Sequence, residues 1–241
     1  MIEWHDEGIV LSARPHGEAA AILDLFTPGH GRHAGVVRGG AGRRLRAVLQ
    51  PGGALAVRWQ ARLEDHLGTF TVEPLHARAG LLEHRLTLAG LAAVTALLSL
   101  ALPERDPHPR LHAATAALLD HAADPGPWAR AYLAWELQLL ESLGFGLDLR
   151  ACAVSGATEG LAYVSPRSGR AVARDAAGEW APRLLPLPPV LLGQGAGAPA
   201  EIVAALTTTG WFVAHRLLAA QGDRPPPAAR ARLVAEIARL G

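Results

Sequence analysis

The sequence contains no lysine, and all 23 of its basic residues are arginine. This absence excludes a P-loop lysine, a Schiff base with pyridoxal phosphate and a lysyl nucleophile. The use of arginine in place of lysine indicates a GC-rich genome, whose codons enrich arginine, alanine, glycine and proline. Arginine nevertheless suits one task better than lysine does, because its planar guanidinium can bind a phosphate through two hydrogen bonds and can stack on a base.

Cysteine is nearly absent as well. Cys152 is the single thiol, so the chain can form neither an intramolecular disulfide nor a four-cysteine metal site. This fits a reducing cytoplasm. The N-terminus carries Glu3, Asp6 and Glu7 where a secretory signal would have basic residues and an apolar core. No export signal is therefore predicted.

One uncharged run, residues 86–102, is 17 residues long and touches the lower limit for a membrane span. It contains alanine, glycine, threonine and serine, and Arg85 and Pro103 bracket it. These residues favour a buried core helix over a membrane-associated segment.

Motifs for catalysis are missing too: there is no HExxH, GxSxG or Walker A sequence, and the acids are scattered. His108 and His112 have the spacing of metal ligands on a helix, but no third ligand accompanies them, which favours a partly exposed helix face. The sequence therefore predicts a protein without cofactor or metal that is not an enzyme. An enzyme built on the helical half is the least favoured alternative.

What is present predicts an α+β protein with two domains. In residues 1–76, short apolar segments alternate with glycine- and proline-rich turns, and residues 43–50 form a small helix between the third and fourth segments. Five strands with this helix are the layout of an OB-fold β-barrel, although other five-stranded barrels share the pattern. The expected strands are residues 8–12, 20–26, 33–38, 55–61 and 68–73.

Residues 77–241 are expected to form a helical domain. Residues 147–178 interrupt it with two β-pieces, 160–165 and 169–174, and residues 184–199 read as a loop rich in proline and glycine. Arg167, Arg170 and Arg174 lie near the turn of this hairpin, and a structural role is favoured for them. The expected helices are residues 81–102, 111–123, 128–143, 201–221 and 228–240.

Positive charge is concentrated in the predicted barrel. Residues 32–62 contain seven arginines and no acid, which gives about +7 in a chain whose net charge is +1. Such a run can be a solvated face, but on a barrel and next to the flexible residues 39–42 it favours contact with nucleic acid. The seven are Arg32, Arg38, Arg43, Arg44, Arg46, Arg58 and Arg62.

Aromatic residues for base stacking are few. Trp59 falls on the strand face opposite the arginines and is expected in the core, while Phe26 and Phe70 fit either role. The pattern predicts backbone-dominated, sequence-independent and salt-sensitive binding. With roughly five arginines on the phosphates of one strand, log K would fall against log salt with a slope of about −3.5.

Several segments in order along the chain resemble the RecO family of bacterial recombination mediators. In the first half they are WHDEGIVL (4–11), RPHGE (14–18), HGRHAGVVRG (30–39) and LQPG (49–52). In the second half they are LESLGF (140–145), LDLRACAVSG (147–156) and YVSPRSGRAV (163–172). No single motif is decisive, but the combination spans nearly the whole chain.

The resemblance implies an N-terminal OB fold and a helical domain with an embedded zinc-finger-like hairpin. Some members of the family bind zinc there through two Cys-x2-Cys pairs. This sequence keeps Cys152 but has Ser155, Ala173 and Ala176 at the other expected positions. A structural zinc site needs four ligands. We therefore expect a hairpin without zinc, in which Cys152 acts as a small buried hydrophobe.

The resemblance also implies binding of single- and double-stranded DNA, annealing of complementary strands and loading of RecA. Its implied partners are RecR and the acidic, hydrophobic tail of single-stranded DNA-binding protein, and its implied location is the cytoplasm, at the nucleoid, with no membrane contact. The helical half is expected to dock partners, and Arg110 and Arg130 are its candidate tail contacts. The alternative function is a protein-interaction scaffold whose DNA binding is incidental. The implied DNA contacts are Arg14, Arg32, Arg38, Arg43, Arg44, Arg46, Arg58 and Arg62.

Overall fold

A computed structural model describes residues 1–121 and 125–241 of the chain. Its contacts divide it into two compact units, Met1–Ala123 and Asp124–Gly241, which are described here separately. The protein is α+β: a five-stranded sheet comes first and helices follow. The expected domain boundary at residues 76 and 77 stays a prediction.

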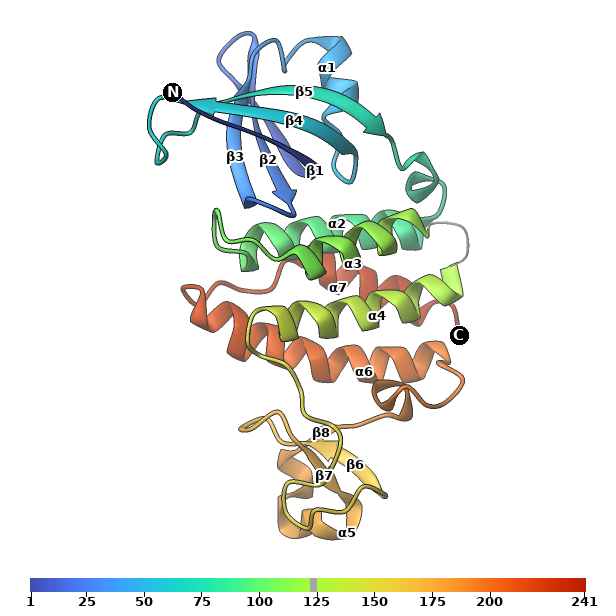
Figure 1. Cartoon of the computed structure of the whole chain (residues 1–241). Coiled ribbons are helices and arrows are strands. Elements are labelled where there is room, and N and C mark those ends of the chain that lie inside the picture. The colour runs from blue at the N-terminus through green and yellow to red at the C-terminus, as the bar shows by residue number, and fades with distance from the viewer. Residues whose placement is uncertain (122–124) are drawn as a thin grey trace. The chain divides into compact units, whose positions relative to one another are not determined.

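The first unit begins with a closed barrel whose strands neighbour one another in the order β1-β2-β3-β5-β4 (Figure 1). All five predicted strands are present, and the helix between β3 and β4 is present too. The elements are β1 (Ile2–His16), β2 (Ala20–Thr27), β3 (Gly31–Val37), α1 (Arg43–Val48), β4 (Ala54–Ala61) and β5 (Thr69–His76).

The barrel closes around alternating apolar side chains. On β4, Leu55, Val57, Trp59 and Ala61 are buried and the residues between them face outward, as period-two alternation predicts. The first strand is longer than expected, because Ile2–Glu7 also pairs with β4. The sequence pattern missed this part, since the less exposed face carries Asp6 beside Trp4.

The seam between β3 and β5 is the shortest of the barrel's junctions. These strands pair in parallel only at Val36 with Thr69 and Val37 with Phe70. The Phe70 ring lies across β3 at Gly35, where a Cβ atom would come within 2.6 Å of it. A glycine at that position therefore lets the aromatic ring close the seam from inside.

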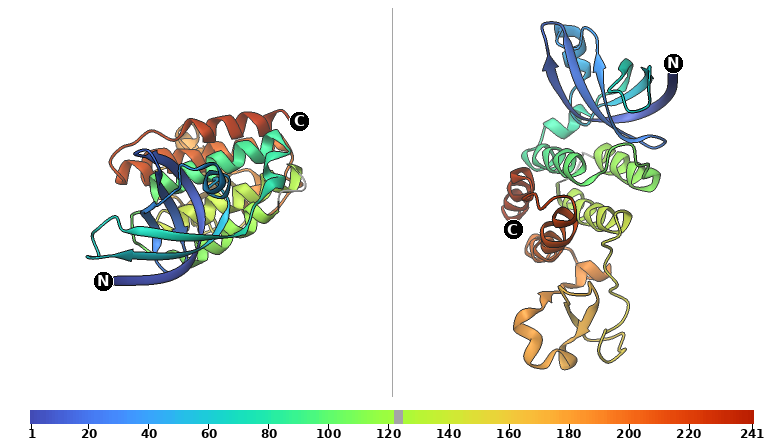
Figure 2. Two further views of the ribbon diagram at one scale, coloured as in Figure 1. Left: turned by 90° about the horizontal axis from the view of Figure 1, so that it is seen from above. Right: turned by 90° about the vertical axis from the view of Figure 1, so that its left-hand side faces the viewer.

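Two helices complete the first unit: α2 (Arg85–Ala101) and α3 (Pro109–Asp120), preceded by the 3₁₀ turn η1 (Ala79–Leu82). Views from two directions place both helices at one end of the barrel (Figures 1 and 2). Ile9 of β1 packs in one buried cluster with Leu81, Leu91 and Leu119. The uncharged run is thus a core helix, and no helix in the described residues is long and apolar enough to cross a membrane.

The second unit contains three main helices, in which α6 packs against both α4 and α7 (Figure 2). Two further elements, β8 and η3, lie within the predicted loop 184–199, which is thus less irregular than expected. The elements are α4 (Pro125–Ser142), β6 (Leu161–Val164), β7 (Ala171–Ala173), α5 (Arg174–Ala177), η2 (Gly178–Arg183), β8 (Leu185–Pro186), η3 (Pro189–Leu192), α6 (Pro199–Phe212), the π-helical η4 (Val213–Leu218) and α7 (Ala228–Ala238).

The expected helices differ from the observed ones mainly at their ends. Predicted helix 81–102 is divided into η1 and α2, and predicted helix 201–221 continues from α6 into a π-helical turn. The predicted helix 111–123 begins two residues earlier, at Pro109. Its last two residues lie outside the described part of the chain.

A buried ion pair joins the three helices of the second unit. Glu136 of α4 is fully buried and accepts hydrogen bonds from Arg230 of α7 at 2.7 and 2.8 Å. The hydroxyls of Tyr132 and Thr209 also donate to Glu136, at 2.9 and 2.5 Å. The α6 backbone admits the guanidinium at Gly210, where a Cβ atom would lie 2.5 Å from Arg230.

The hairpin insertion forms a three-stranded sheet in the order β7-β6-β8. Cys152 is buried beside Val172, Ala173 and Ala177. Its Sγ accepts backbone N–H groups from Ala173 at 3.2 Å and from Ser155 at 3.4 Å. Burial raises the pKa of this thiol, but the hydrogen bonds from Ala173 and Ser155 lower it to about 6.

Candidate nucleic-acid interface

Six of the eight candidate arginines share two features. They are exposed, and their side chains form no ion pair and no hydrogen bond with the described residues, 1–121 and 125–241. Arg58 and Arg32 differ, and each is taken up below. The six are Arg14, Arg38, Arg43, Arg44, Arg46 and Arg62.

The short helix α1 carries three of these arginines. Arg43, Arg44 and Arg46 are exposed on it, while Leu45 packs against the barrel core. Because Leu45 is the anchoring residue, the basic residues on either side of it face solvent. Pro51 follows the helix, which ends at Val48.

The glycine-rich turn before α1 brings the helix to the end of the β1–β2 hairpin. The Ala41 amide donates to the Ala19 carbonyl at 3.2 Å, and a Cβ atom on Gly40 would lie 2.7 Å from Ala21. This close approach requires glycine. Arg14, which pairs with Ile22 near the same hairpin, therefore belongs to the same end of the barrel as α1.

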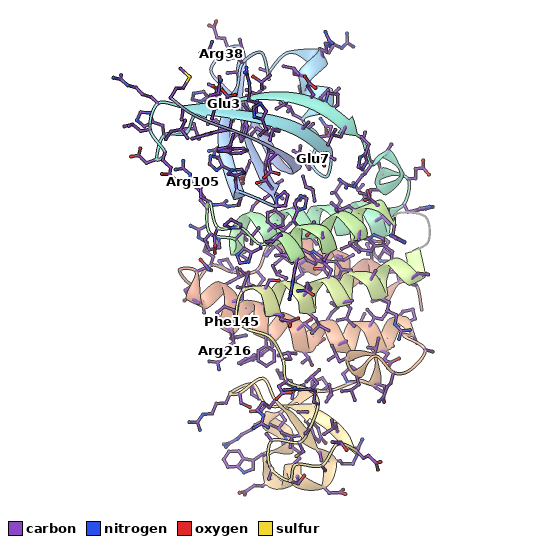
Figure 3. All side chains as sticks on the ribbon, viewed as in Figure 1. Glu3, Glu7, Arg38, Arg105, Phe145 and Arg216 are labelled. Atoms are coloured by element: carbon purple, nitrogen blue, oxygen red, sulfur yellow. The ribbon has the colours of Figure 1, made fainter. Side chains whose placement is uncertain are left out.

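The sheet register sets Arg38 and Arg58 on either side of one β5 residue. Val37 pairs with Phe70, so the next residue, Arg38, comes level with Thr71. Thr71 in turn pairs with Arg58 across β4 and β5. Arg38 projects from the end of the barrel that carries α1 (Figure 3). Arg58 has an exposed neighbour of opposite charge, Glu3, at 3.9 Å.

Arg32 is placed differently from the other candidates. Its guanidinium donates to the Ser99 carbonyl at 2.9 Å, and it pairs with Glu104 at 3.1 Å and with Asp24 at 3.4 Å. Its side chain is only 18% exposed. Arg32 thus ties β3 to the end of α2 and to the α2–α3 connection. Sequence reasoning could not separate it from the free arginines.

Arg62 begins the β4–β5 loop, which a residue missed by the sequence reasoning holds in place. Arg105, in the α2–α3 connection, donates to the carbonyls of Glu64 and His66. Its guanidinium lies 6.0 Å from the ring centre of Trp59. Arg105 also adopts a left-handed backbone with φ of 61°, which is costly for a residue other than glycine. No sequence signal marks this contact across 41 residues.

The aromatic residues of the barrel are mostly internal. Trp59 is 1% exposed, as predicted, and the two ambiguous residues, Phe26 and Phe70, are 0% and 4% exposed. Trp4 is half-buried and stacks on His30 with the ring centres 3.9 Å apart. A surface for successive stacked bases therefore does not form from Trp59, Phe26 and Phe70.

Two histidines of the first unit pack against aromatic rings, and of these His33 is buried and His112 is half-buried. His33 packs edge-on against Trp59 at 4.8 Å, and burial, followed by the charge of Arg105, lowers its pKa to about 4. His112 packs against Phe26 at 5.3 Å, and burial lowers its pKa as well. His112 thus takes part in packing between α3 and the barrel.

Metal ligands do not converge in the part of the chain that the structure describes, where no group of three or more His, Cys, Asp or Glu could hold an ion. The hairpin does not fit the zinc that the resemblance implies for some family members. Its one thiol is surrounded by alanine and valine side chains and accepts two backbone amides. Cys152 is thus a buried packing residue of the hairpin.

The two candidate tail contacts fall in different units. Arg110 is exposed on α3 of the first unit. Arg130, on α4 of the second unit, lines a cavity of about 590 Å³ whose other walls are largely apolar. Those walls include Pro127, Ile202, Ile237 and Leu240.

Comparison with known proteins covers nearly the whole chain. Residues 1–78 match the family model "Recombination protein O N terminal", and residues 82–225 match "Recombination protein O C terminal". A protein named DNA repair protein RecO from Ruegeria sp. (strain TM1040) is 56% identical over 239 residues, 99% of each chain. Its namesake from Paracoccus denitrificans (strain Pd 1222) is 57% identical over 236 residues, 98% of this chain and 96% of the relative.

Proposed function

Because the chain belongs to the RecO family of DNA repair proteins, we propose that it is a non-enzymatic recombination mediator. It binds single- and double-stranded DNA, anneals complementary strands and helps to load RecA together with RecR. The observation that carries the DNA-binding part is the gathering of exposed arginines at the α1 end of the barrel.

The barrel is, in this proposal, an OB fold. Closure in the order β1-β2-β3-β5-β4 with a helix between β3 and β4 supports it, since OB folds are five-stranded barrels that bind oligonucleotides. The phosphate contacts are Arg14, Arg38, Arg43, Arg44, Arg46, Arg58 and Arg62. Arg32 acts indirectly, because its hydrogen bonds to α2 and to the α2–α3 connection position β3.

Annealing on such a surface needs no bond chemistry. Guanidinium groups neutralise phosphates on two strands, lower the repulsion between them and release counterions. Base pairing then supplies the specificity. Arginine is suited to this role, because its fork binds phosphate at two points.

We expect replacement of Arg43, Arg44 and Arg46 by alanine to weaken binding of single-stranded oligonucleotides strongly. Three lost phosphate contacts should reduce the slope of log K against log salt by about 2, at about 0.7 per contact. Fluorescence anisotropy at several salt concentrations measures both quantities. Replacement of the same residues by lysine should keep most of the slope, because the charges remain.

The matched control changes three exposed arginines of the second unit, Arg174, Arg224 and Arg232, to alanine. It has the same net charge as the test variant but should retain affinity and slope. Unchanged oligonucleotide affinity in the α1 variant would refute DNA binding by this helix. It would favour the scaffold in which DNA binding is incidental.

The cavity beside Arg130 is the proposed site for the tail of single-stranded DNA-binding protein. An acidic, hydrophobic peptide needs apolar walls and a cation, and this cavity offers both. Arg130 is exposed, and its side chain lies along Gly197, where a Cβ atom would be 3.5 Å from it. Arg110 lies outside the walls of this cavity.

We expect Arg130→Glu to weaken binding of a synthetic tail peptide by at least about tenfold, since a like charge then faces the acidic peptide. Isothermal titration with the intact protein measures the affinity. Arg232→Glu, an equal charge change at an exposed site of α7, should bind the peptide normally. Equal affinity of the two variants would place the tail elsewhere.

A further inference from the structure

A groove of about 320 Å³ lies at the seam between β3 and β5, where residues of β4 and α1 also line it. Its apolar floor is formed by the half-buried side chains of Val72 and of Leu45 in α1, which pack against the core residues Val37 and Phe70. Phe70 and Val37 are buried from solvent at 4% and 2% exposure. The groove borders the short β3–β5 seam, where the two strands pair at only two positions.

The rim of the groove is polar and partly cationic. Gln60, Thr69 and Thr71 are neighbours across the β4–β5 ladder, where Gln60 pairs with Thr69. Arg38 closes the rim on the β3 side. These side chains offer an amide and two hydroxyls, which can donate and accept hydrogen bonds at the same edge.

The arginines around the groove indicate that its ligand would be an anion. Arg58 stands next to it on β4, opposite Thr71. Arg44 and Arg46 flank Leu45, whose side chain forms part of the floor. Acidic charge is also near: Glu3 accepts a hydrogen bond from Gln60 and lies 3.9 Å from Arg58. Cations nevertheless outnumber it, so a polyanion would pass over the groove.

We propose that this groove takes up one base of a bound single strand while the neighbouring arginines hold its phosphates. A nucleobase has an apolar face for the floor and hydrogen-bonding edges for Gln60, Thr69 and Thr71. This inference rests on the proposed DNA binding and adds a base subsite to it. It predicts that the barrel favours single-stranded over duplex DNA, because paired bases cannot enter the groove.

The test compares an oligothymidylate with a strand of equal length whose residues lack bases. The wild-type protein should bind the base-bearing strand about tenfold more tightly, the scale of one well-placed base. In the variant Gln60→Leu/Thr71→Leu, which fills the groove and removes its hydrogen-bonding groups, this preference should fall to about twofold or less. The salt slope should not change, because every arginine remains.

Ser12→Leu is the matched control, since Ser12 is an exposed hydroxyl residue on β1 that does not line the groove. It should keep the full preference for bases. A wild-type protein that binds both strands equally, or a groove variant that keeps its preference, would overturn the base subsite but leave the phosphate contacts standing. Failure of wild-type protein to bind either strand would refute the proposed function itself.

Discussion

Replacement of Arg230 by methionine should destabilise the second unit by about 3–5 kcal/mol, the usual result of removing one partner from a buried ion pair. The cost arises at Glu136, which is 0% exposed and would lose the guanidinium that binds both of its oxygens. The remaining hydroxyls of Tyr132 and Thr209 cannot balance a full negative charge.

The pH dependence of this variant's stability should show that the unpaired charge on Glu136 causes the loss. In the wild-type protein burial alone would raise the pKa of Glu136, but Arg230 keeps it below its usual range. Without Arg230 burial dominates, so the pKa in the folded state rises above that in the unfolded state. Stability should then be regained as the pH falls, because the folded state binds the proton more tightly.

Hydrogen exchange in α4 and α6 measures the stability of this unit within the whole chain. The double variant Glu136→Gln/Arg230→Met removes both charges and should recover most of the loss. A single variant as stable as the wild type would mean that the ion pair contributes little. A double variant as unstable as the single one would mean that lost packing, and not the isolated charge, causes the effect.

Lowering the pH from about 6.5 to 4 should destabilise the first unit through His33. Among the described residues neither ring nitrogen of His33 has a hydrogen-bond partner, and its pKa is about 4 in the fold. In the unfolded chain it is about 6.5. The stabilisation is fully present above the unfolded value and is lost as the pH falls toward the folded one. A difference of about 2.5 pKa units corresponds to about 3 kcal/mol.

The measurement is urea unfolding at several pH values for the wild type and for His33→Leu. Asp24 has the opposite effect on the pH dependence of stability. Burial raises its pKa to about 6, so the folded state binds a proton more tightly than the unfolded state, and stability rises as the pH falls. Both proteins contain Asp24, so it cancels in the difference between them. The free energy of unfolding of the wild type, relative to that of His33→Leu, should fall by about 3 kcal/mol as the pH is lowered to 4. Parallel pH profiles would show that His33 does not titrate in this way.

Local patterns in the sequence were enough to predict the barrel strands and most helices. Alternation on β4 placed Leu55 and Trp59 inside, and it placed Arg58 outside. The N-terminal part of β1 escaped notice, since Asp6 there interrupts the apolar pattern. Its carboxylate accepts hydrogen bonds from the Gly29 amide and the His30 ring, and such a partner lies too far along the chain to be seen.

In the candidate site, too, local features could be predicted from the sequence and long-range contacts could not. Charge density identified the exposed arginines of α1, because their exposure follows from a single anchoring leucine. It could not distinguish Arg32, which is bound to Glu104 and to the Ser99 carbonyl. Nor could it find Arg105 or Arg230, whose roles depend on partners 39 to 94 residues away. Burial and long-range contact decide what an arginine does.

The β8 strand of the hairpin insertion has a consequence for self-association. A sheet edge with free amides and carbonyls invites another chain to add a strand, whereas the closed barrel has no such edge. β8 is an edge of the small sheet but contains only Leu185 and Pro186. Proline cannot donate to an added strand, and the Pro186 carbonyl already accepts the Thr208 hydroxyl at 2.6 Å. This edge is therefore protected against the addition of a strand from another copy of the chain.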